Sequence, residues 1–559
     1  MNAMKRFGLS GIALAAMLSA ACSAPQAASP APGAPSGAAP AQGAAPAAPK
    51  VNRVVMAVPA PSTESNQPRN IGQTTMWQIA PMYEYLIHLD ANNGKLVPGL
   101  ATEWNVAPDA GSIRFKLRQG VEFQGGNGQF TAKDVVHSWK DLTQQDATAG
   151  YQVVLARRTI KDVETVSDSE VVLRLQAKDS DLINMISQAQ GGFEIMSKAH
   201  FDKAGDPSLT TPPIAGTGPY QYKARSQGQN FVFERVPYKH WRVTPDFPEF
   251  EFRWVKEAST RLASLIAGEV HVTSLPSDLL PQATKAGHKI VVGKVPALRT
   301  FVSIWCCYLK DSKYVFPDSP LADVRVRKAL NKALDRDALN KAFFQGKGTL
   351  TYGFNHIPET HAGFNPQWKE RFKDEYGYDP AKAQQLLAEA GYSAPKPMKT
   401  TMFVHPLATF SGAEDIVEAM AGAWRKIGVD VQLSNMDTTQ MGTLSRDCKL
   451  DNHMDIIGTS GAPIVAYGYY NATVVGNCGG YQHPDTDASF EKIRQELDPE
   501  KHGPLWRTVG DLAYPLHASI PLFWLPAEAV VNTTVVADYP WPGSISGTWT
   551  HVETLKAVK

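Results

Sequence analysis

The chain has 559 residues, 43% of them hydrophobic, and its 55 basic and 54 acidic side chains leave a formal net charge of +1. Such a balance argues against a nucleic-acid-binding protein and against a funnel for acidic substrates. The length is sufficient for roughly two to four domains, so a small single-core protein is excluded.

A short apolar segment opens the chain. Two basic residues precede an uncharged run from Phe7 to Ala21, which is typical of a secretory signal and too short for a comfortable membrane span. The run ends in LSAA (18–21) directly before Cys22, and this junction resembles a bacterial lipobox. We therefore expect residues 1–21 to be a lipoprotein signal peptide and Cys22 to carry the lipid. The alternative is an ordinary leader that happens to contain a cysteine.

An alanine- and proline-rich tract follows Cys22 and carries no charge before Lys50. Such a tract cannot bury a core, so residues 22–50 are expected to be the lipidated cysteine and a disordered tether. No later apolar run is long enough to span a bilayer. The sequence predicts an exported protein that a lipid anchors to a membrane, at the periplasmic face or the outer cell surface.

Beyond the tether the sequence alternates between strand-like and helix-like periods. Strands are expected at 53–59, 231–237 and 250–255, and a hairpin is expected at 112–124, with Ile113, Phe115 and Leu117 alternating. Helices are expected at 130–142, 259–270 and 379–392 and in two runs within 322–346, and a helix is expected to pass into a strand at 426–433. In the helix at 259–270, Leu262, Leu265 and Ile266 are expected to lie on one face. Thr131 and Asp134 resemble a capping box at the start of the first of these helices. The pattern predicts an α/β fold, and no repeat indicates a solenoid or a propeller.

Several of these segments together resemble one known family. Residues 96–139, which begin LVPGLATEW and end KDVVHSW, resemble the signature of the family 5 extracellular solute-binding proteins of ABC importers, a group that includes oligopeptide-, dipeptide- and nickel-binding proteins. The agreement extends to AGTGPYQYK (215–223), VRVRKALNKALDRDAL (324–339), YGYDPAKAQQLLAEAGY (376–392), WRKIGVDVQL (424–433), GGYQHPDTDASFEKI (479–493) and SIPLFW (519–524). The local chemistry agrees, because Gly216 and Gly218 allow a tight chain reversal before Pro219, and Asp379 with Pro380 can begin a helix.

The resemblance implies an α/β fold of the periplasmic-binding-protein-like type II (cluster C), with two hinged lobes and an additional inserted lobe. Lobe I would combine residues 51–91, 212–300 and 529–559, the inserted lobe II would be 92–211, and lobe III would be 301–528. Lobes I and III would close over a small-molecule or short-peptide solute, and an ABC permease and ATPase complex would read the closed form. The resemblance therefore implies a monomer that needs no catalytic group, cofactor, metal or nucleic acid.

The identity of the solute depends on one stretch of the expected lobe III. Peptide-binding members place a carboxylate a few residues beyond a small-residue turn, where it pairs with the α-ammonium of the peptide. The corresponding stretch, MDIIGTSGAPIVAYGYYNA (454–472), has no acidic residue after Gly458. An ammonium buried without a partner costs several kcal/mol, so we expect weak peptide affinity. The predicted ligand-binding side chains are Trp77, Trp305, Ser460 and Tyr467, and ordinary packing or surface exposure is the alternative for each.

Two alternatives to an importer component stay open. GNCGG (476–480) has the G-x-C-x-G shape of a nucleophile elbow, so an exported hydrolase with a cysteine nucleophile is one alternative. The turn-rich YQHPDTD that follows argues against it, because an elbow leads directly into a helix. The second alternative is a binding protein whose closed form reports to a membrane sensor.

The remaining histidines and cysteines have simpler interpretations. His483, Asp485 and Asp487 could form a cation loop, but a helix cap is the expected role. His271 is expected at the surface. Cys448 and Cys478 could pair across a loop, whereas Cys306 and Cys307 could form a vicinal bridge or stay as buried thiols.

Overall fold

A computed structural model describes residues 49–61, 63–72, 75–293, 298–310, 313–352, 357–405, 413–436, 438–459, 478, 480–543 and 549–559. The chain divides into two units, Met1–Ala47 and Ala48–Lys559, and the description below concerns the second. The leader and Cys22 lie outside the described residues. None of the helices in the described ranges is long and apolar enough to cross a membrane.

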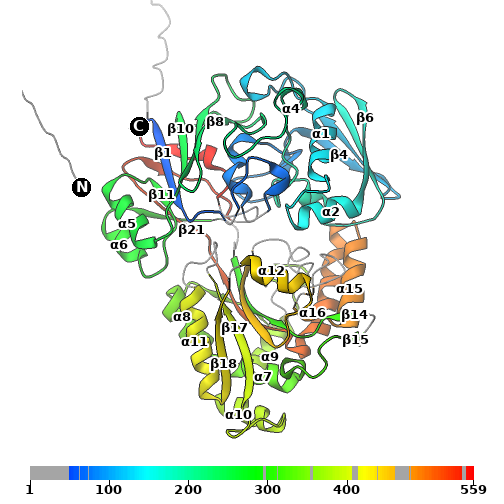
Figure 1. Cartoon of the computed structure of the whole chain (residues 1–559), viewed down its shortest axis with the longest axis vertical. Coiled ribbons are helices and arrows are strands. Elements are labelled where there is room, and N and C mark those ends of the chain that lie inside the picture. The colour runs from blue at the N-terminus through cyan, green and yellow to red at the C-terminus, as the bar shows by residue number, and fades with distance from the viewer. Residues whose placement is uncertain are drawn as a thin grey trace, which may run out of the picture. The chain divides into compact units, whose positions relative to one another are not determined.

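The largest sheet has seven strands in the order β12-β21-β11-β1-β10-β9-β8. Its strands are β1 (Arg53–Val58), β8 (Tyr220–Ser226), β9 (Asn230–Arg235), β10 (Glu249–Trp254), β11 (Val272–Thr273), β12 (Lys289–Val292) and β21 (Glu528–Val531). The buried strand β1 pairs in parallel with β10 and β11 (Figure 1). The predicted strands at 53–59, 231–237 and 250–255 are therefore confirmed within one or two residues. Helices α5 (Ala258–Ala267) and α6 (Leu280–Lys285) pack beside this sheet.

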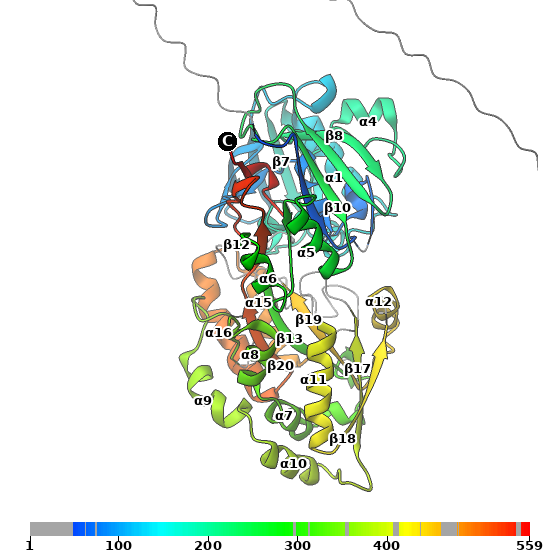
Figure 2. The same cartoon turned by 90° about the vertical axis from the view of Figure 1, so that its left-hand side faces the viewer.

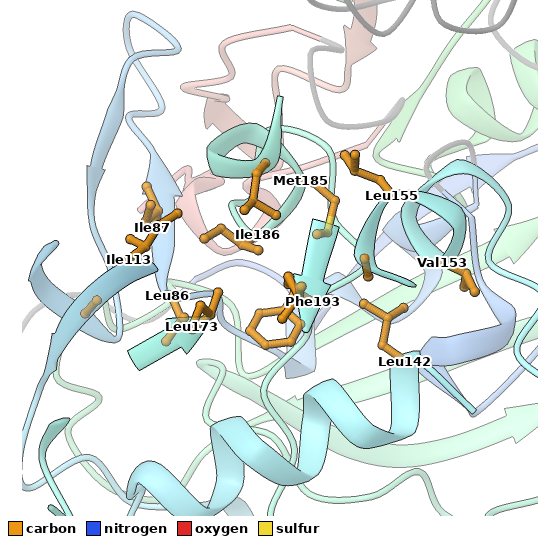
Figure 3. Packing of buried hydrophobic residues seen from close by; sticks show 14 of the residues in the cluster. Leu86, Ile87, Ile113, Leu142, Val153, Leu155, Leu173, Met185, Ile186 and Phe193 are labelled. Carbon is orange, nitrogen blue, oxygen red and sulfur yellow. The ribbon is translucent and has the colours of Figure 1, made fainter. Parts of the chain in front are cut away.

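An antiparallel sheet of four strands has the order β4-β5-β7-β6. Its strands are β4 (Ala101–Val106), β5 (Ser112–Leu117), β6 (Ile160–Ser167) and β7 (Glu170–Leu175), and its helices are α1 (Ala132–Leu142), α2 (Tyr151–Thr159), α3 (Leu182–Met185) and α4 (Lys198–Ala204). The alternation in β5 is confirmed, since Ile113, Phe115 and Leu117 are buried between exposed neighbours. The predicted hairpin at 112–124 is wrong, because β5 pairs with β4 and β7. Figure 3 shows Ile113 and Phe193 within the core that covers this sheet.

The third large sheet has six strands in the order β16-β20-β13-β19-β17-β18. Its strands are β13 (Leu298–Trp305), β16 (Thr349–Leu350), β17 (Met398–Val404), β18 (Val429–Asn435), β19 (His453–Thr459) and β20 (Ser519–Leu525). The accompanying helices are α7 (Val324–Lys332), α8 (Arg336–Phe344), α9 (Pro366–Tyr376), α10 (Pro380–Glu389), α11 (Ala413–Lys426), α12 (Thr438–Arg446), α15 (Pro484–Gln495) and α16 (His502–Ala513). Figure 2 shows α11 running along the strands, and its buried side chains share a core with Val302 and Met402. Three small sheets complete the strands: β2 (Ile87–Leu89) with β3 (Leu96–Pro98), β14 (Leu309–Lys310) with β15 (Lys313–Tyr314), and β22 (Val536–Asp538) with β23 (Lys556–Ala557).

The predicted helix ends depend on local hydrogen bonds. The backbone N–H of Thr131 donates to the Asp134 carboxylate at 2.8 Å before α1, which confirms the capping box. Asp379 accepts from the backbone N–H of Lys382 at 2.9 Å and begins α10. The predicted face of α5 is only partly correct, because Ile266 is 51% exposed.

Gly216 and Gly218 lie against the backbone of Met82. A Cβ atom at either position would overlap main-chain atoms of that segment. The N–H of Gly218 donates to the carbonyl oxygen of Met82 at 2.8 Å, and the Gln124 amide donates to the same oxygen at 2.9 Å. These glycines are therefore required by close approach of two main chains, whereas the sequence suggested only a tight reversal.

Candidate functional site

Two neighbouring connections join the seven-stranded sheet to the six-stranded sheet. The chain leaves β12 after Val292 and enters β13 at Leu298, and it returns from Leu525 of β20 to Glu528 of β21. β12 pairs with β21 and β13 pairs with β20, both antiparallel, so the outgoing and returning strands run side by side. We call these two strand pairs the connecting ribbon. Among the described strands it is the only passage between these two sheets, and such a passage allows two lobes to rotate as rigid bodies.

The six-stranded sheet has two chemically different faces. Val302 and Ile304 point into the helix-covered core, so Ser303 and Trp305, which alternate with them, lie on the opposite face. Asp455 of β19 is the register partner of Ser303 and therefore shares that face. We call this second face, with Phe301, Ser303, Trp305, Phe403, His453 and Asp455, the polar face.

A small apolar cluster covers part of the polar face. Trp305, which is 9% exposed, packs with Phe403 and Leu450. The partly buried side chains that join them come from α12 and the residues just before it, namely Met436, Met441 and Leu444. Figure 1 shows α12 at the end of the strands opposite to α10. Trp305 therefore belongs to a cluster separate from the main core of the sheet.

A buried histidine–aspartate pair lies beside this cluster. His405 follows β17, and its Nε2 is 2.6 Å from Oδ1 of Asp455. Asp455 is 1% exposed, and this burial raises the pKa of its carboxyl, whereas the hydrogen bond to His405 acts in the opposite direction. Within the described part of the chain, Oδ2 of Asp455, Oγ of Ser303 and Nε1 of Trp305 are buried without a hydrogen-bond partner. Such groups are rare in folded proteins and are often found where a ligand or water binds.

Both cysteine pairs are disulfides. Cys306 and Cys307 form a vicinal bridge directly after Trp305, so the alternative of buried thiols is wrong. Cys448 and Cys478 are joined with their Cα atoms 5.1 Å apart. A disulfide-bonded Cys478 has no thiolate to act as a nucleophile, which contradicts the cysteine-hydrolase alternative.

The predicted ligand-binding residues have different outcomes. Trp77 lies in η2 (Met76–Gln78), is 4% exposed, and makes edge-to-face contacts with Phe252 and Trp254 at 4.9 and 5.5 Å between ring centroids. Ser460 and Tyr467 lie outside the described residues. Of the two predicted residues within the described ranges, Trp305 lies on the polar face and Trp77 packs in the core of the seven-stranded sheet, and a contact between any of the four residues and a solute stays a prediction.

Two histidines also differ in outcome. His271 was expected at the surface and is buried, because its Nδ1 accepts a hydrogen bond from the backbone N–H of Val55 at 3.0 Å. Desolvation lowers the pKa of His271, so the neutral acceptor form is favoured. His483 is the N-cap of α15 and accepts from the backbone N–H of Asp485 at 3.3 Å, which confirms the predicted cap.

Sequence reasoning missed the polar residues of the polar face. Ser303, His405 and Asp455 are far apart in the chain and meet only because β13, β17 and β19 are neighbours. One signal was available, because HMD (453–455) places polar residues two apart within an otherwise apolar strand, and Ser303 is a polar residue within another.

Three comparisons with known proteins agree with this architecture. Residues 95–488 match the family described as bacterial extracellular solute-binding proteins, family 5. The dipeptide-binding protein of Escherichia coli is 28% identical over 422 residues, which cover 70% of this chain and 73% of that protein. The periplasmic oligopeptide-binding protein OppA of Haemophilus influenzae is 24% identical over 479 residues, which cover 82% of this chain and 84% of that protein. Heme-binding protein A of Haemophilus influenzae is 27% identical over 370 residues, which cover 62% of this chain and 63% of that protein.

Solved structures show the same fold. The periplasmic binding protein DppA of Helicobacter pylori, in complex with the peptide STSA, superposes with a TM-score of 0.71 at 20% identity, over 89% of this chain and 97% of that one. NikZ of Campylobacter jejuni, in complex with Ni(L-His), gives a TM-score of 0.69 at 18% identity, over 87% and 94%. The expected fold class, periplasmic-binding-protein type II, is confirmed by these likenesses. The chain therefore belongs to the bacterial extracellular solute-binding proteins, family 5, the substrate-binding components of ABC importers.

Proposed function

We propose that the protein is a lipid-anchored, extracytoplasmic binding protein that captures a small polar or peptide-like solute and delivers it to an ABC permease and its ATPase. Family membership supports the importer partner, and the junction before Cys22 supports the anchor. Relatives named for dipeptides, oligopeptides and heme support a small organic solute without selecting one.

The observation that carries this proposal is the connecting ribbon. Two antiparallel strand pairs can bend together, so the sheets at their two ends can approach each other without unfolding. We place lobe I at 51–91, 212–300 and 529–559, the inserted lobe II at 92–211 and lobe III at 301–528. The three large sheets support this division, because each falls almost entirely within one of these lobes.

Solute binding would use the polar face of lobe III. Trp305 supplies an indole on that face, and we keep Trp77, Ser460 and Tyr467 as further proposed contacts. A solute that touches both lobes binds the closed arrangement more tightly than the open one and so increases the population of the closed arrangement. A permease can then recognise this closed arrangement.

A thermal-shift screen tests the binding proposal. The full-length chain is extracted in mild detergent, stripped of solute by mild unfolding, refolded, and mixed with short peptides, oligosaccharides, or nickel with and without chelators. A ligand at 100 times its Kd stabilises the folded state by about 2.7 kcal/mol, which raises the unfolding midpoint measurably. We expect one of these classes to raise the midpoint. A midpoint that no class moves would contradict solute binding.

The anchor has a separate test. Cells that express the chain are labelled with a radioactive fatty acid, and the labelled protein is compared with a Cys22→Ser variant. We expect label on the wild-type chain and none on the variant, because the other four cysteines are paired in disulfides. Equal label on both proteins would contradict lipidation at Cys22.

A further inference from the structure

We propose that a pocket between the proposed lobes II and III binds an oxyanion of the phosphate or sulfate type, and that this anion stabilises the closed arrangement. The pocket has a volume of about 620 Å³, and its lining residues are Arg158, Ala177 and Lys178 from lobe II and Glu491, Arg494 and Gln495 from lobe III. None of these six residues belongs to the polar face. The anion site depends only on this pocket, whereas its effect on closure rests on the proposed function.

The side chains around the pocket carry an excess of positive charge. Arg158, Lys178 and Arg494 bring three positive charges, whereas Glu491 and the buried Asp179 bring two negative ones. Lys178 is exposed and makes no ion pair with the residues that the structure describes. One positive charge is therefore left over among these five side chains, and it favours an anion in the pocket.

Arg158 has hydrogen-bond donors that the described chain does not use. Its Nη2 donates to Oδ2 of Asp179, and Nε and Nη2 of Arg494 reach the same oxygen at 3.1 Å. Nε and Nη1 of Arg158 are buried and have no acceptor among the described residues, which is rare in folded proteins. The Arg158 side chain is 23% exposed and borders the pocket, so a small turn of its guanidinium brings these donors to an anion bound there.

The positions of the two arginines have a simpler explanation in part. Arg158 lies in the last turn of α2 and Arg494 in the last turn of α15, where a cation compensates the negative end of a helix. That role accounts for the two charges but gives the free donors of Arg158 no acceptor. Lys178 lies in neither helix, so its place beside the arginines needs a different reason.

The lining residues select the class of anion. Guanidinium and ammonium groups are the side chains that bind phosphate and sulfate, and a tetrahedral oxyanion offers several acceptors to donors from different directions. Glu491 is held at 2.6 Å from Nη1 of Arg494 and leaves Lys178 and the unused donors of Arg158 to the anion. The pocket is larger than one such ion, so the same chemistry fits free phosphate and the phosphate group of a small organic ester.

An anion in this pocket would link the two lobes. Arg158 and Lys178 contribute from lobe II and Arg494 contributes from lobe III, so the site is complete only while these lobes are in contact. A ligand that binds only this arrangement increases its population. By linkage, anion and solute then increase each other's affinity by the same factor.

Anion titrations test the site on the full-length chain in detergent, without solute. The unfolding midpoint is measured with phosphate, sulfate, methyl phosphate and chloride at equal ionic strength and low millimolar concentration, where the general stabilisation of proteins by phosphate and sulfate is small. We expect a saturable rise of the midpoint above that in chloride. A rise with phosphate and sulfate would support a free oxyanion, and a rise with methyl phosphate alone would support an organic ester.

Variants of opposite sign assign the rise to this pocket. Lys178→Gln removes an exposed cation and should raise the Kd of the anion roughly threefold or more, whereas Glu491→Gln removes a neighbouring carboxylate and should lower it by a similar factor. Arg158→Gln should weaken the anion roughly tenfold, and the exposed Lys178 serves if that variant fails to fold. Lys285→Gln is the matched control, because Lys285 is an exposed lysine at the end of α6 and does not line the pocket. Its Kd should equal that of wild type.

The effect on closure is measured separately. The Kd of the tightest probe from the solute screen should be roughly fivefold lower in saturating phosphate than in chloride of equal ionic strength. In Lys178→Gln this difference should shrink at the same phosphate concentration, because less of the site is occupied.

The outcomes separate the site, its effect and the proposed function. Midpoints that no oxyanion raises above chloride, or equal rises in wild type, Lys178→Gln and Glu491→Gln, would overturn the anion site. Anion binding that follows the expected order, with the same solute Kd in phosphate and chloride, would overturn the effect on closure. Failure of every solute in the screen would contradict the proposed function alone, because the anion titrations contain no solute.

Discussion

Asp179, in the loop between β7 and α3, accepts two hydrogen bonds at 3.1 Å from the guanidinium of Arg494, which lies 315 residues later at the end of α15. The Arg158 side chain donates to the same carboxylate oxygen. The backbone N–H of Ser180 donates to the carbonyl oxygen of Arg494 at 2.9 Å, and the hydroxyl of Ser180 donates to the carbonyl oxygen of Ile493 at 3.1 Å. The proposed lobes II and III are thus in direct contact here, whereas the connecting ribbon joins lobes I and III.

This contact predicts a role for Asp179 in closure. Asp179→Asn leaves Arg494 and Arg158 without their carboxylate, and breaking a buried pair of this kind costs about 3 to 5 kcal/mol. If the contact forms only on closure, we expect solute affinity to fall at least roughly tenfold, because the closed form loses stability relative to the open form. Calorimetry with the tightest probe from the screen measures this.

The control is Asp168→Asn, which removes an exposed carboxylate 3.9 Å from Lys133 and should leave affinity unchanged. A lower unfolding midpoint for Asp179→Asn with wild-type solute affinity would show instead that the contact is a permanent part of the fold.

A buried carboxyl predicts an unusual pH dependence of stability. Oε1 of Glu194 accepts from the Tyr85 hydroxyl at 3.0 Å and from the backbone N–H of Gly192 at 3.2 Å, but desolvation dominates and raises the pKa of Glu194 from 4.5 to about 7. Between these values the folded chain holds a proton that the unfolded chain has released. The stability contributed by Glu194 therefore falls as the pH rises from about 4.5 to 7.

The Glu194→Gln variant has no carboxyl to titrate at this position, so it lacks the pH-dependent contribution of Glu194 to the unfolding free energy. We expect the variant to gain about 3 kcal/mol over wild type in unfolding free energy between pH 4.5 and 7.5, measured by urea denaturation. Glu164→Gln is the control, because it removes an exposed carboxylate whose pKa is lowered. This variant should not gain unfolding free energy over wild type as the pH rises from about 4.5 to 7.5. A constant difference for Glu194→Gln would contradict the raised pKa.

The close approach at Gly216 predicts a large effect of a single methyl group. In Gly216→Ala the new Cβ would overlap the carbonyl oxygen of Met82, and we expect a loss of about 3 kcal/mol in unfolding free energy. Gly422→Ala is the matched control, because Gly422 lies in α11 with no atom within 4 Å of an added Cβ. This control should gain up to about 1 kcal/mol. Equal stability of the two variants would contradict the packing at Met82.

The Cys448–Cys478 disulfide is expected to stabilise the folded chain by closing a loop. It joins residues 30 positions apart, so its removal should lower the unfolding free energy by about 3 to 4 kcal/mol through the entropy of the unfolded chain. The Cys448→Ser/Cys478→Ser double variant tests this by urea denaturation. Dithiothreitol should lower the midpoint of wild type much more than that of the double variant. An unchanged midpoint in the double variant would contradict the estimate.

Local sequence signals predicted much of this fold. Helix caps at Thr131 and Asp379 and the alternation in β5 depend on neighbours within a few residues, and all three are confirmed. The errors arose from distant partners. His271 is buried because β1 lies beside it, and in α5 the buried side chains are Arg261, Leu262 and Leu265, whereas Ile266 is exposed.

The candidate site was less predictable for the same reason. Asp455 and His405 are separated by 50 residues, and their pairing depends on the parallel neighbours β17 and β19. No periodicity within either segment reveals which strands will be adjacent. Trp305 was predicted from sequence as an aromatic residue near a lobe crossing. The structure places it on the polar face, and its contact with a solute stays a prediction.

Solute-driven closure is the central claim, and one distance tests it most directly. Lys178 and Gln495 are exposed residues that line one pocket beside the Asp179–Arg494 contact. Spin labels on Lys178→Cys and Gln495→Cys, in the full-length chain with its disulfides intact, report the separation of lobes II and III by pulsed electron resonance. Lobe II is hydrogen-bonded to lobe I through Gln124, which donates to the carbonyl oxygens of Met82 and Gly218, so this distance also reports the approach of lobe I to lobe III. We predict a broad, longer distance without solute and a narrow, shorter one with the tightest probe from the screen. Identical distance distributions in the two conditions would contradict closure.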